Sequence, residues 1–458
     1  MPEEERPLQQ QLRNGEIHTM LRNEECVATK LKRIAEKARK DPNCRFTSLF
    51  HLMDHDLLWE CFWDLKKCKA SGIDQITKEQ YEENLMANLD DLIERLHRMA
   101  YIPQPVLRVN IPKPGSDKMR PLGIPTIEDK LVQTGLSRIL QAVYEQDFID
   151  DSYGFRPHRG CHDALRTLNQ TIERQGTEYI VEADIRGFFD NVDQDQLMKF
   201  LAHRIADKRV LRYIKRILKS GIQEDGVFHA SDRGTPQGGV ISPLLANIYL
   251  HYTLDLWFER GFRRTCTGIT RFIRYADDFV VCFKHEADAR RFRIEMEERL
   301  NRFGLEIAPE KTKILEFGPL ARPRAKQKGE KAETFDFLGF THYCTTSVTG
   351  RMFRVGRKSI SKRITAKLKL FKEWLRASRT QSTAAIMETV ANKLRGHYAY
   401  YGVTGNSKSI QNFYYEVERL LFKWLGRRGK RGSLTYAKFQ LLLQRFPLPL
   451  PRIVVRLW

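Results

Sequence analysis

The spacing of apolar and polar positions predicts helices near both ends of the chain and a mixed region between them. Residues 1–45 are highly charged and largely helical up to Asp41 and Pro42, because proline disfavours helix in the residue before it. In residues 54–72 apolar side chains recur at helical spacing, and Gly72 marks the expected end of that helix. They are Leu57, Leu58, Cys61, Phe62 and Leu65.

The middle of the chain, from about residue 101 to 345, alternates short β-branched runs with helical patterns, which is typical of an α+β domain. Within it, residues 318–333 are rich in Gly, Pro and Lys and predict an exposed loop. The last hundred residues are mainly helical. No internal repeat is present.

Acidic side chains interrupt two of the predicted strands. Residues 179–184 form an alternating, β-branched run that ends at Asp184. Residues 271–283 predict a hairpin with Asp277 and Asp278 at its turn. Taken alone, the second pair is also explained as a solvated turn, because Asp is common in turns.

Composition places the chain among globular proteins of a reducing compartment. Its 458 residues are 41% hydrophobic, enough to bury the cores of two or three packed units. The eight cysteines form no Cys-x-x-Cys pair, which argues against a zinc ribbon or a disulfide framework. The N-terminus is polar, and no apolar run reaches about 18 residues. We therefore expect a cytoplasmic protein, neither secreted nor membrane-spanning.

The positive charge is concentrated in the last quarter of the sequence. Residues 341–458 hold 24 Lys and Arg against four Glu and no Asp, which is +20 of the total net charge of +21. Because Tyr, Phe and Trp are interleaved with these cations, the pattern favours nucleic acid as the partner over a merely solvated face. Tyr398, Tyr400 and Tyr401 are consistent either with base stacking or with helix packing.

Two acid-bearing strand ends suggest metal-assisted phosphoryl transfer. Mg²⁺ prefers oxygen ligands and is usually held by one or two carboxylates together with substrate phosphates. Two such ions about 3.5 to 4 Å apart activate an attacking hydroxyl and stabilise a leaving oxygen. Asp184, Asp277 and Asp278 could supply this site if their strands meet at one sheet edge.

At this point the sequence resembles a known family. "YADD" and "ADIRGFFDNVD" are similar to the palm of reverse transcriptases, and further segments match the ordered blocks of the group II intron-encoded branch, from about residue 46 to the end. These segments are "IPKPGSDKMRPLGIPTIEDKLVQ" (111–133), "DSYGFRPHRGCHDAL" (151–165), "GTPQGGVISPLLANIYL" (234–250), "GLEIAPEKTKI" (304–314) and "FDFLGF" (335–340). The resemblance implies a right-hand polymerase, with fingers and palm followed by a mainly α-helical thumb, domain X.

The resemblance also implies roles for individual residues. Asp184, Asp277 and Asp278 match the catalytic, metal-binding triad, which uses two Mg²⁺ ions. The residues that match nucleotide-binding positions are Lys113 and Arg120 on the triphosphate, Phe189 against the sugar, Gln237 in the pocket and Lys311 near the primer end. Without the resemblance, the first two also fit a solvated basic loop, and Phe189 fits ordinary core packing.

Four sequence blocks follow from this comparison. Residues 1–45 are a lead-in that matches nothing in the family, and 46–340 hold the fingers and palm with an N-terminal extension around "KASGIDQITKEQYEEN". Residues 341–425 match the thumb, and 426–458 form a short basic tail that is at most a DNA-binding segment. Many relatives add an endonuclease domain with His, Asn and paired Cys residues. No such cluster is present, so the resemblance does not extend to target-strand nicking.

The implied function is an RNA-directed DNA polymerase, a nucleotidyltransferase, that also binds its group II intron RNA as a maturase in splicing and retrohoming of this mobile element. The implied partners are intron RNA or another structured RNA template, a DNA primer or target, and deoxynucleoside triphosphates, with no membrane. One alternative is a domesticated polymerase of the same lineage in DNA repair or phage defence. Another is a splicing factor that only binds RNA, although such a protein would have no need to keep the three acids, Lys113, Arg120 and Gln237.

Overall fold

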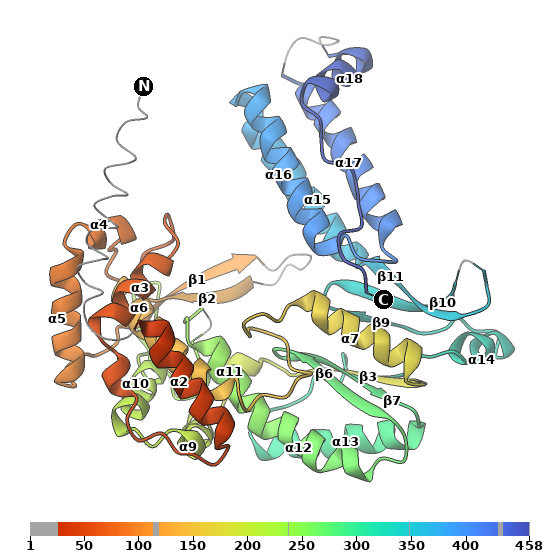
Figure 1. Cartoon of the computed structure of the whole chain (residues 1–458). Helices are drawn as coiled ribbons and strands as arrows, with labels where there is room; N and C mark the ends of the chain where they lie inside the picture. Colours follow the sequence, from red (N-terminus) through yellow and green to blue (C-terminus); the bar gives the residue numbers. More distant parts are fainter. Residues whose placement is uncertain (1–25, 113–118, 237, 348, 429–433, 458) are drawn as a thin grey trace. The chain divides into compact units, whose positions relative to one another are not determined.

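The computed structural model describes residues 26–112, 119–236, 238–347, 349–428 and 434–457 (Figure 1). The chain forms two compact units. Unit 1 comprises Met1–Val109, Pro121–Ile149 and Gly187–Tyr252, and unit 2 comprises Asn110–Arg120, Asp150–Arg186 and Thr253–Trp458. Each unit is therefore assembled from segments that lie far apart in the sequence.

Unit 1 is mostly helical and is built around α6 (Ile127–Tyr144), against which α2 (Val27–Lys40) and α3 (His55–Asp64) pack. Helix α2 ends just before Asp41 and Pro42, as expected. Helix α3 ends at Asp64, well before Gly72, because the lysine-rich segment that follows has no apolar face to bury. The other helices of this unit are α4 (Lys78–Glu82), α5 (Leu85–His97), α8 (Phe188–Asn191), α9 (Gln194–Arg204), α10 (Lys208–Leu218) and α11 (Ser242–Leu250).

A small sheet with the strand order β2-β1-β4-β5 accompanies these helices. Its strands are β1 (Val106–Pro112), β2 (Met119–Ile124), β4 (Ile222–Glu224) and β5 (Val227–His229). A buried carboxylate, that of Asp207, ties the start of α10 to an earlier segment. It accepts hydrogen bonds from the backbone amides of Leu49 and Phe50 at 2.7 and 2.8 Å and from the amide of Arg209 at 2.9 Å.

Unit 2 contains an antiparallel sheet with the strand order β6-β7-β3-β8, which is buried on both faces. Helix α7 (Cys161–Arg174) covers one face, and α12 (Leu256–Arg260) with α13 (Glu286–Arg302) covers the other. Because both faces are covered, these strands are apolar at most positions. The strands are β3 (Tyr179–Asp184), β6 (Thr270–Tyr275), β7 (Asp278–Phe283) and β8 (Lys313–Glu316).

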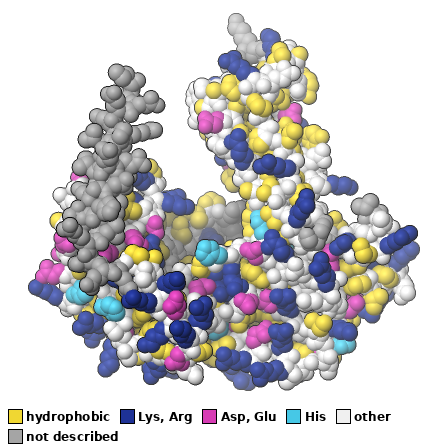
Figure 2. All heavy atoms as spheres, in the orientation of Figure 1, with side chains coloured by type: hydrophobic (Ala, Val, Ile, Leu, Met, Phe, Trp, Pro, Cys, Tyr) yellow, Lys and Arg dark blue, Asp and Glu magenta, His cyan; other side chains and the backbone are white. Residues whose placement is uncertain are grey.

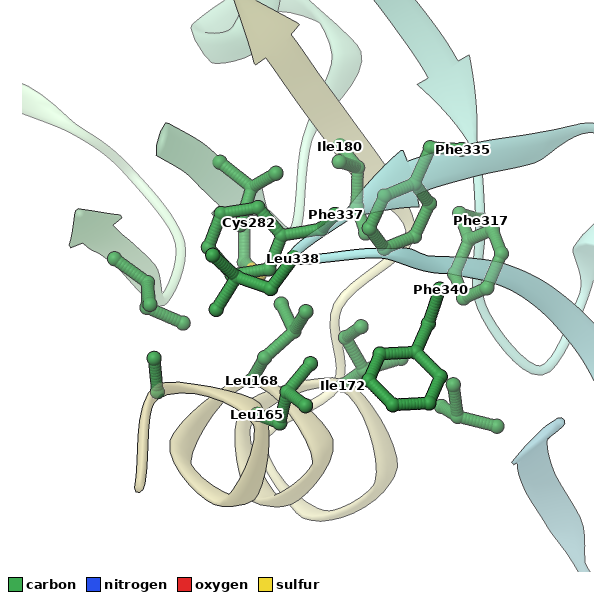
Figure 3. Close-up of a cluster of buried hydrophobic side chains, with 14 of the residues drawn as sticks. Leu165, Leu168, Ile172, Ile180, Cys282, Phe317, Phe335, Phe337, Leu338 and Phe340 are labelled. Atoms are coloured by element: carbon green, nitrogen blue, oxygen red, sulfur yellow. The ribbon is translucent and has the colours of Figure 1, made fainter. Parts of the chain in front are cut away.

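A second antiparallel sheet joins the α7 side of this core. Its strands are β9 (Thr334–Phe337), β10 (Phe340–Thr346) and β11 (Phe353–Ser359), with β10 in the middle. Figure 3 shows Leu165, Leu168 and Ile172 of α7 lying beside Cys282 and beside phenylalanines that include Phe335 and Phe340. The two sheets and α7 therefore share one hydrophobic core.

The C-terminal region of unit 2 is helical and has a core of its own. Its helices are α15 (Ser361–Ala377), α16 (Thr383–Tyr401), α17 (Ser407–Leu425) and α18 (Tyr436–Arg445). The chain then returns to the sheets. Leu457 is fully buried in the core that α7 shares with the sheets, and the amide of Val455 donates to the carbonyl of Gly402 at 3.0 Å.

The α+β architecture with a helical C-terminal region is as expected, but two local expectations are wrong, the end of a helix at Gly72 and the loop at 318–333. The expected loop 318–333 contains the helix α14 (Ala321–Gln327). The block from residue 341 begins with β10 and β11, so the helices start only at Ser361. Within the basic tail 426–458, α18 buries Phe439 in the helical core, and Leu457 is buried among the sheets. Within the described residues, no helix is long and apolar enough to cross a membrane.

Candidate active site

Two of the predicted acids lie opposite each other at the end of the unit 2 sheet. Strands β3 and β7 are antiparallel, and Asp184 is the register partner of Asp278. Directly opposed residues share a face of the sheet. The strand end expected at Asp184 and the hairpin expected around Asp277 are thus both present, and the fold brings them together.

The hairpin turn that carries Asp277 is strained. Tyr275 pairs with Asp278, so Ala276 and Asp277 form a two-residue turn. Ala276 has φ of 57°, in the left-handed region that such a turn requires at its first position and that normally favours glycine. Backbone strain of this kind costs on the order of 1 kcal/mol or more and persists only where the surroundings impose it.

A buried ion pair stabilises this turn. The guanidinium of Arg274 donates to both carboxylate oxygens of Asp255, Nε to Oδ1 at 2.8 Å and Nη2 to Oδ2 at 2.5 Å, and neither side chain is exposed to solvent. Nη1 of Arg274 also donates to the carbonyl of Ala276 at 3.0 Å. Arg274 therefore connects the strained turn to a rigid, desolvated anchor.

The segment around Gly154 supports the turn from the side. The amide of Arg274 donates to the carbonyl of Asp151, and the amide of Tyr153 donates to the carbonyl of Arg274, each at 2.9 Å. A side chain at Gly154 would place its Cβ 2.3 Å from the backbone nitrogen of Ala276. Only glycine therefore allows the two backbones to lie this close.

The acids repel one another, as carboxylates poised for a cation do. Burial, and then repulsion from Asp277 and Asp184, raises the pKa of Asp278 to about 7. Burial also raises the pKa of Asp277, with Asp184 adding to the shift and the charges of Arg120 and Arg274 opposing it. A divalent cation at this place would relieve both the desolvation and the repulsion.

Two further groups lie beside the acids within unit 2. Lys311 donates from Nζ to Oδ2 of Asp184 at 2.5 Å, with both side chains partly exposed. The turn between β9 and β10 brings the backbone amide of Leu338 within hydrogen-bonding distance of Asp278. Positive φ at Leu338 and at Gly339 shapes that turn.

A second carboxyl on β3, that of Glu182, is not indicated by the sequence motifs. Burial, and then the charges of Asp336 and Asp278, raises the pKa of Glu182 to about 7. Its position two residues before Asp184, on the same strand face, is the signal that could have identified it.

The predicted nucleotide-binding residues, unlike the three acids, do not all lie in unit 2. Arg120 lies on β2 and belongs to unit 2, where its charge acts on Asp277. Phe189 lies in α8 of unit 1, partly exposed, with its ring 5.4 Å from that of the buried Phe188. Lys113 and Gln237 lie outside the described residues.

The tyrosines of the C-terminal region belong mainly to its packing. Tyr398 is buried in the helical core, and Tyr400 and Tyr401 pack against the core of the sheets. His397 is fully buried and stacks on Phe413 with a centroid distance of 3.8 Å. The outer face of α15, by contrast, carries exposed cations, among them Lys362, Lys369, Lys372 and Arg376.

The donor set fits a hard divalent cation. Within the described part of the chain, no three His, Cys, Asp or Glu side chains are arranged so that together they could hold a metal ion. Asp184, Asp277 and Asp278 nevertheless offer only carboxylate oxygens, partly exposed and mutually repelling, which is the ligand chemistry that Mg²⁺ and similar ions require.

Comparisons with known proteins agree with this geometry. Residues 111–342 match the family model described as "Reverse transcriptase (RNA-dependent DNA polymerase)", and residues 361–441 match "Group II intron, maturase-specific domain". The chain is 30% identical over 475 residues to the group II intron-encoded protein LtrA of Lactococcus lactis subsp. cremoris, which covers 88% of this chain and 78% of that protein. It is also 34% identical over 286 residues to the protein YkfC of Escherichia coli K12, covering 55% of this chain and 74% of that protein.

Proposed function

The chain belongs to the group II intron-encoded reverse transcriptases, RNA-directed DNA polymerases with a maturase domain, and from this premise we propose that Asp184, Asp277 and Asp278 form its catalytic centre. The observation that carries the proposal is the pairing of Asp184 with Asp278 across β3 and β7, next to the strained turn at Ala276. A polymerase of this family depends on a divalent metal, and we propose Mg²⁺ in a two-metal site.

The three carboxylates would hold these ions. Ions held there would lower the pKa of the attacking hydroxyl and stabilise the charge that develops on the leaving oxygen. The protein's own contribution is to fix the carboxylates before substrate arrives. Arg274 and Gly154 hold the turn, and the amide of Leu338 orients Asp278. Such preorganisation avoids the cost of reorienting ligands during the reaction.

The remaining predicted residues would position the substrates. We propose that Lys113 and Arg120 bind the triphosphate of the incoming nucleotide, for which a point charge and a bidentate fork are both suited. Phe189 would pack on the deoxyribose and exclude a 2′-hydroxyl, and Gln237 would line the pocket. Lys311, which pairs with Asp184, would exchange that carboxylate for substrate phosphate near the primer end.

The nucleic-acid partners follow from the two matched domains. A reverse transcriptase domain requires an RNA template and a primer, and the maturase domain indicates a structured RNA. We propose that this RNA is a group II intron, bound in part by the exposed cations on α15, and that the primer is DNA. The eight free cysteines favour a reducing cytoplasm as the place of action.

The test is DNA synthesis by an Asp277→Ala variant on an RNA template with a DNA primer. We expect incorporation to fall by at least about a thousandfold, as expected for loss of electrostatic stabilisation at the reacting phosphate, while RNA affinity stays within about twofold. Asp195→Ala, at an exposed position of α9, is the matched control and should retain activity. An Asp277→Ala protein that polymerises near the wild-type rate would refute the assignment. A wild-type protein that binds RNA but makes no DNA would instead support the binding-only alternative.

A further inference from the structure

Helix α10 of unit 1 is strongly two-sided. One side buries Val210, Tyr213, Ile214, Ile217 and Leu218 in the core of the unit. The other side presents a row of cations spaced four, three and four residues apart, which places them along one line of an α-helix. This α10 stripe consists of Lys208, Arg212, Lys215 and Lys219, all exposed.

The stripe is not neutralised by neighbouring acids. Helix α10 contains no Asp or Glu. Within the described part of the chain, Lys208, Arg212 and Lys215 form no ion pair, and only Lys219 pairs, with the exposed Asp232 at 3.0 Å. The carboxylate nearest the start of the helix, Asp207, is buried and taken up by backbone amides.

Further cations extend the surface at its N-terminal end. Arg209 is exposed beside Lys208. The exposed Arg45 precedes Phe46, which pairs with Ile205 just ahead of α10. Figure 2 shows Lys and Arg side chains on the lower part of this unit, where Figure 1 draws α2, α9 and α10.

Net charge conceals this surface. The first 340 residues carry a net charge of only +1, because the remaining +20 lies after them. A net charge summed over these residues does not show that the acids of unit 1 lie on other elements, while the charged residues of α10 are all cations. A surface of this kind that were merely solvated would gain stability from interspersed acids at i and i+4, and here they are absent.

We propose that the α10 stripe is a second RNA-binding surface, separate from α15, that contacts the phosphate backbone of a folded RNA. The stripe is about 16 Å long, because its ends are 11 residues apart at about 1.5 Å per residue. One strand of a duplex presents a phosphate about every 3.4 Å of its axis, so the stripe spans about five phosphates. The assignment to RNA rests on the proposed function, whereas the geometry requires only a phosphodiester backbone.

The test compares full-length proteins in a salt series. Lys208, Arg212 and Lys215 are replaced together by Gln, which retains helix propensity and length while removing the charge. The probes are a long, perfectly paired RNA hairpin and a DNA duplex of the same sequence. The matched control removes the same charge from exposed cations of unit 2, with Arg322, Lys326 and Lys331 replaced by Gln in a segment where Glu330 and Glu333 are interspersed.

The expected result is a loss of salt dependence confined to the stripe. Each phosphate that is no longer neutralised reduces the slope of log K against log salt by about 0.7 to 0.9, so the stripe variant should have an RNA slope shallower by about 2 to 3. The control variant should keep the wild-type slope. DNA synthesis on a short template and primer should be unchanged in both variants, since α10 carries none of the proposed catalytic residues.

Three outcomes would overturn the proposal. If log K for RNA had the same slope against log salt in the stripe variant and the wild type, the stripe would be either a solvated surface or a surface that binds an acidic protein. Equal reductions in the stripe and control variants would mean a general charge effect. A reduction on the DNA duplex alone would assign the stripe to DNA. Failure of the proposed function is distinguishable, because a wild-type protein without polymerase activity would leave this binding comparison intact.

Discussion

Replacing Asp278 by Asn should abolish DNA synthesis and, at the same time, make the metal-free protein more stable at high pH. In the folded protein the pKa of Asp278 is raised from 3.8 to about 7, first by burial and then by the charges of Asp277 and Asp184. Between these two values the folded state binds more protons than the unfolded state. Stability therefore falls as pH rises from about 4 to about 7, and above pH 7 the whole penalty remains.

The size of the effect follows from the shift. A difference of about three pKa units at about 1.4 kcal/mol each sets an upper limit of about 4 kcal/mol for the cost of ionising Asp278 in the folded protein. Partial solvent access reduces this cost. In the variant, the NH2 group of Asn can also take the place of the carboxylate oxygen that accepts a hydrogen bond from the backbone amide of Leu338, and that bond is then lost. We therefore expect the variant to gain at least about 1 kcal/mol at pH 8, or at least about 1 °C in melting temperature for a chain of 458 residues.

The stability difference between the wild-type protein and the Asp278→Asn variant is measured by thermal unfolding in the presence of a chelator, at pH 5 and pH 8. At pH 5 only about a third of the penalty for ionising Asp278 is present, because pH 5 lies about 1.2 above the ordinary pKa of 3.8 and the raised pKa lies about 3.2 above it, so the variant should melt only slightly higher than the wild type. At pH 8 the variant should melt higher, and added Mg²⁺ should raise the wild-type melting temperature more than that of the variant. Asp195→Asn on the surface of α9 is the control and should show no such pH dependence. A variant that is less stable at pH 8, or a difference equal at both pH values, would refute the reasoning.

Three other sets of substitutions test separate parts of the molecule. Phe189→Ala should raise ribonucleotide incorporation relative to deoxynucleotides, measured as the ratio of the two kcat/KM values, and an unchanged ratio would mean that the ring serves only packing. Arg274→Met should lower the free energy of unfolding, measured by chemical denaturation, by about 3 to 5 kcal/mol, because it leaves Asp255 charged and buried. Adding Asp255→Leu should restore stability. It should not restore polymerase activity, since the contact to Ala276 is still missing. Replacing Lys362, Lys369, Lys372 and Arg376 by Gln should flatten the salt dependence of RNA binding by about 3 to 4 in slope, and no change would remove α15 from the RNA-binding surface.

The α15 substitutions are a fairer test of the basic C-terminal quarter than removal of everything after residue 340. Such a truncation would delete β10 and β11 and take Leu457 out of the core that α7 shares with the sheets. Loss of binding would then report unfolding as much as lost charge. Point substitutions on an exposed helix face leave that core intact.

Local pattern in the sequence determined the elements that carry the chemistry. The apolar run that ends at Asp184 and the hairpin interrupted by Asp277 and Asp278 were both readable, because strand alternation and turn residues act within a few positions of one another. The end of α2 before Pro42 was readable for the same reason. The ordered motifs then implied the family, which the matched models confirm.

Tertiary structure alone decided how these elements are held and what their surroundings do. The pairing of Arg274 with Asp255, the approach of Gly154 to Ala276 and the burial of Leu457 all join residues through space, and a periodic pattern carries no information about such partners. The raised pKa of Asp278 likewise depends on burial and on neighbours from other strands. The α10 stripe became visible only when the fold separated its buried face from its exposed one, because net charge counts residues without regard to the direction in which their side chains point.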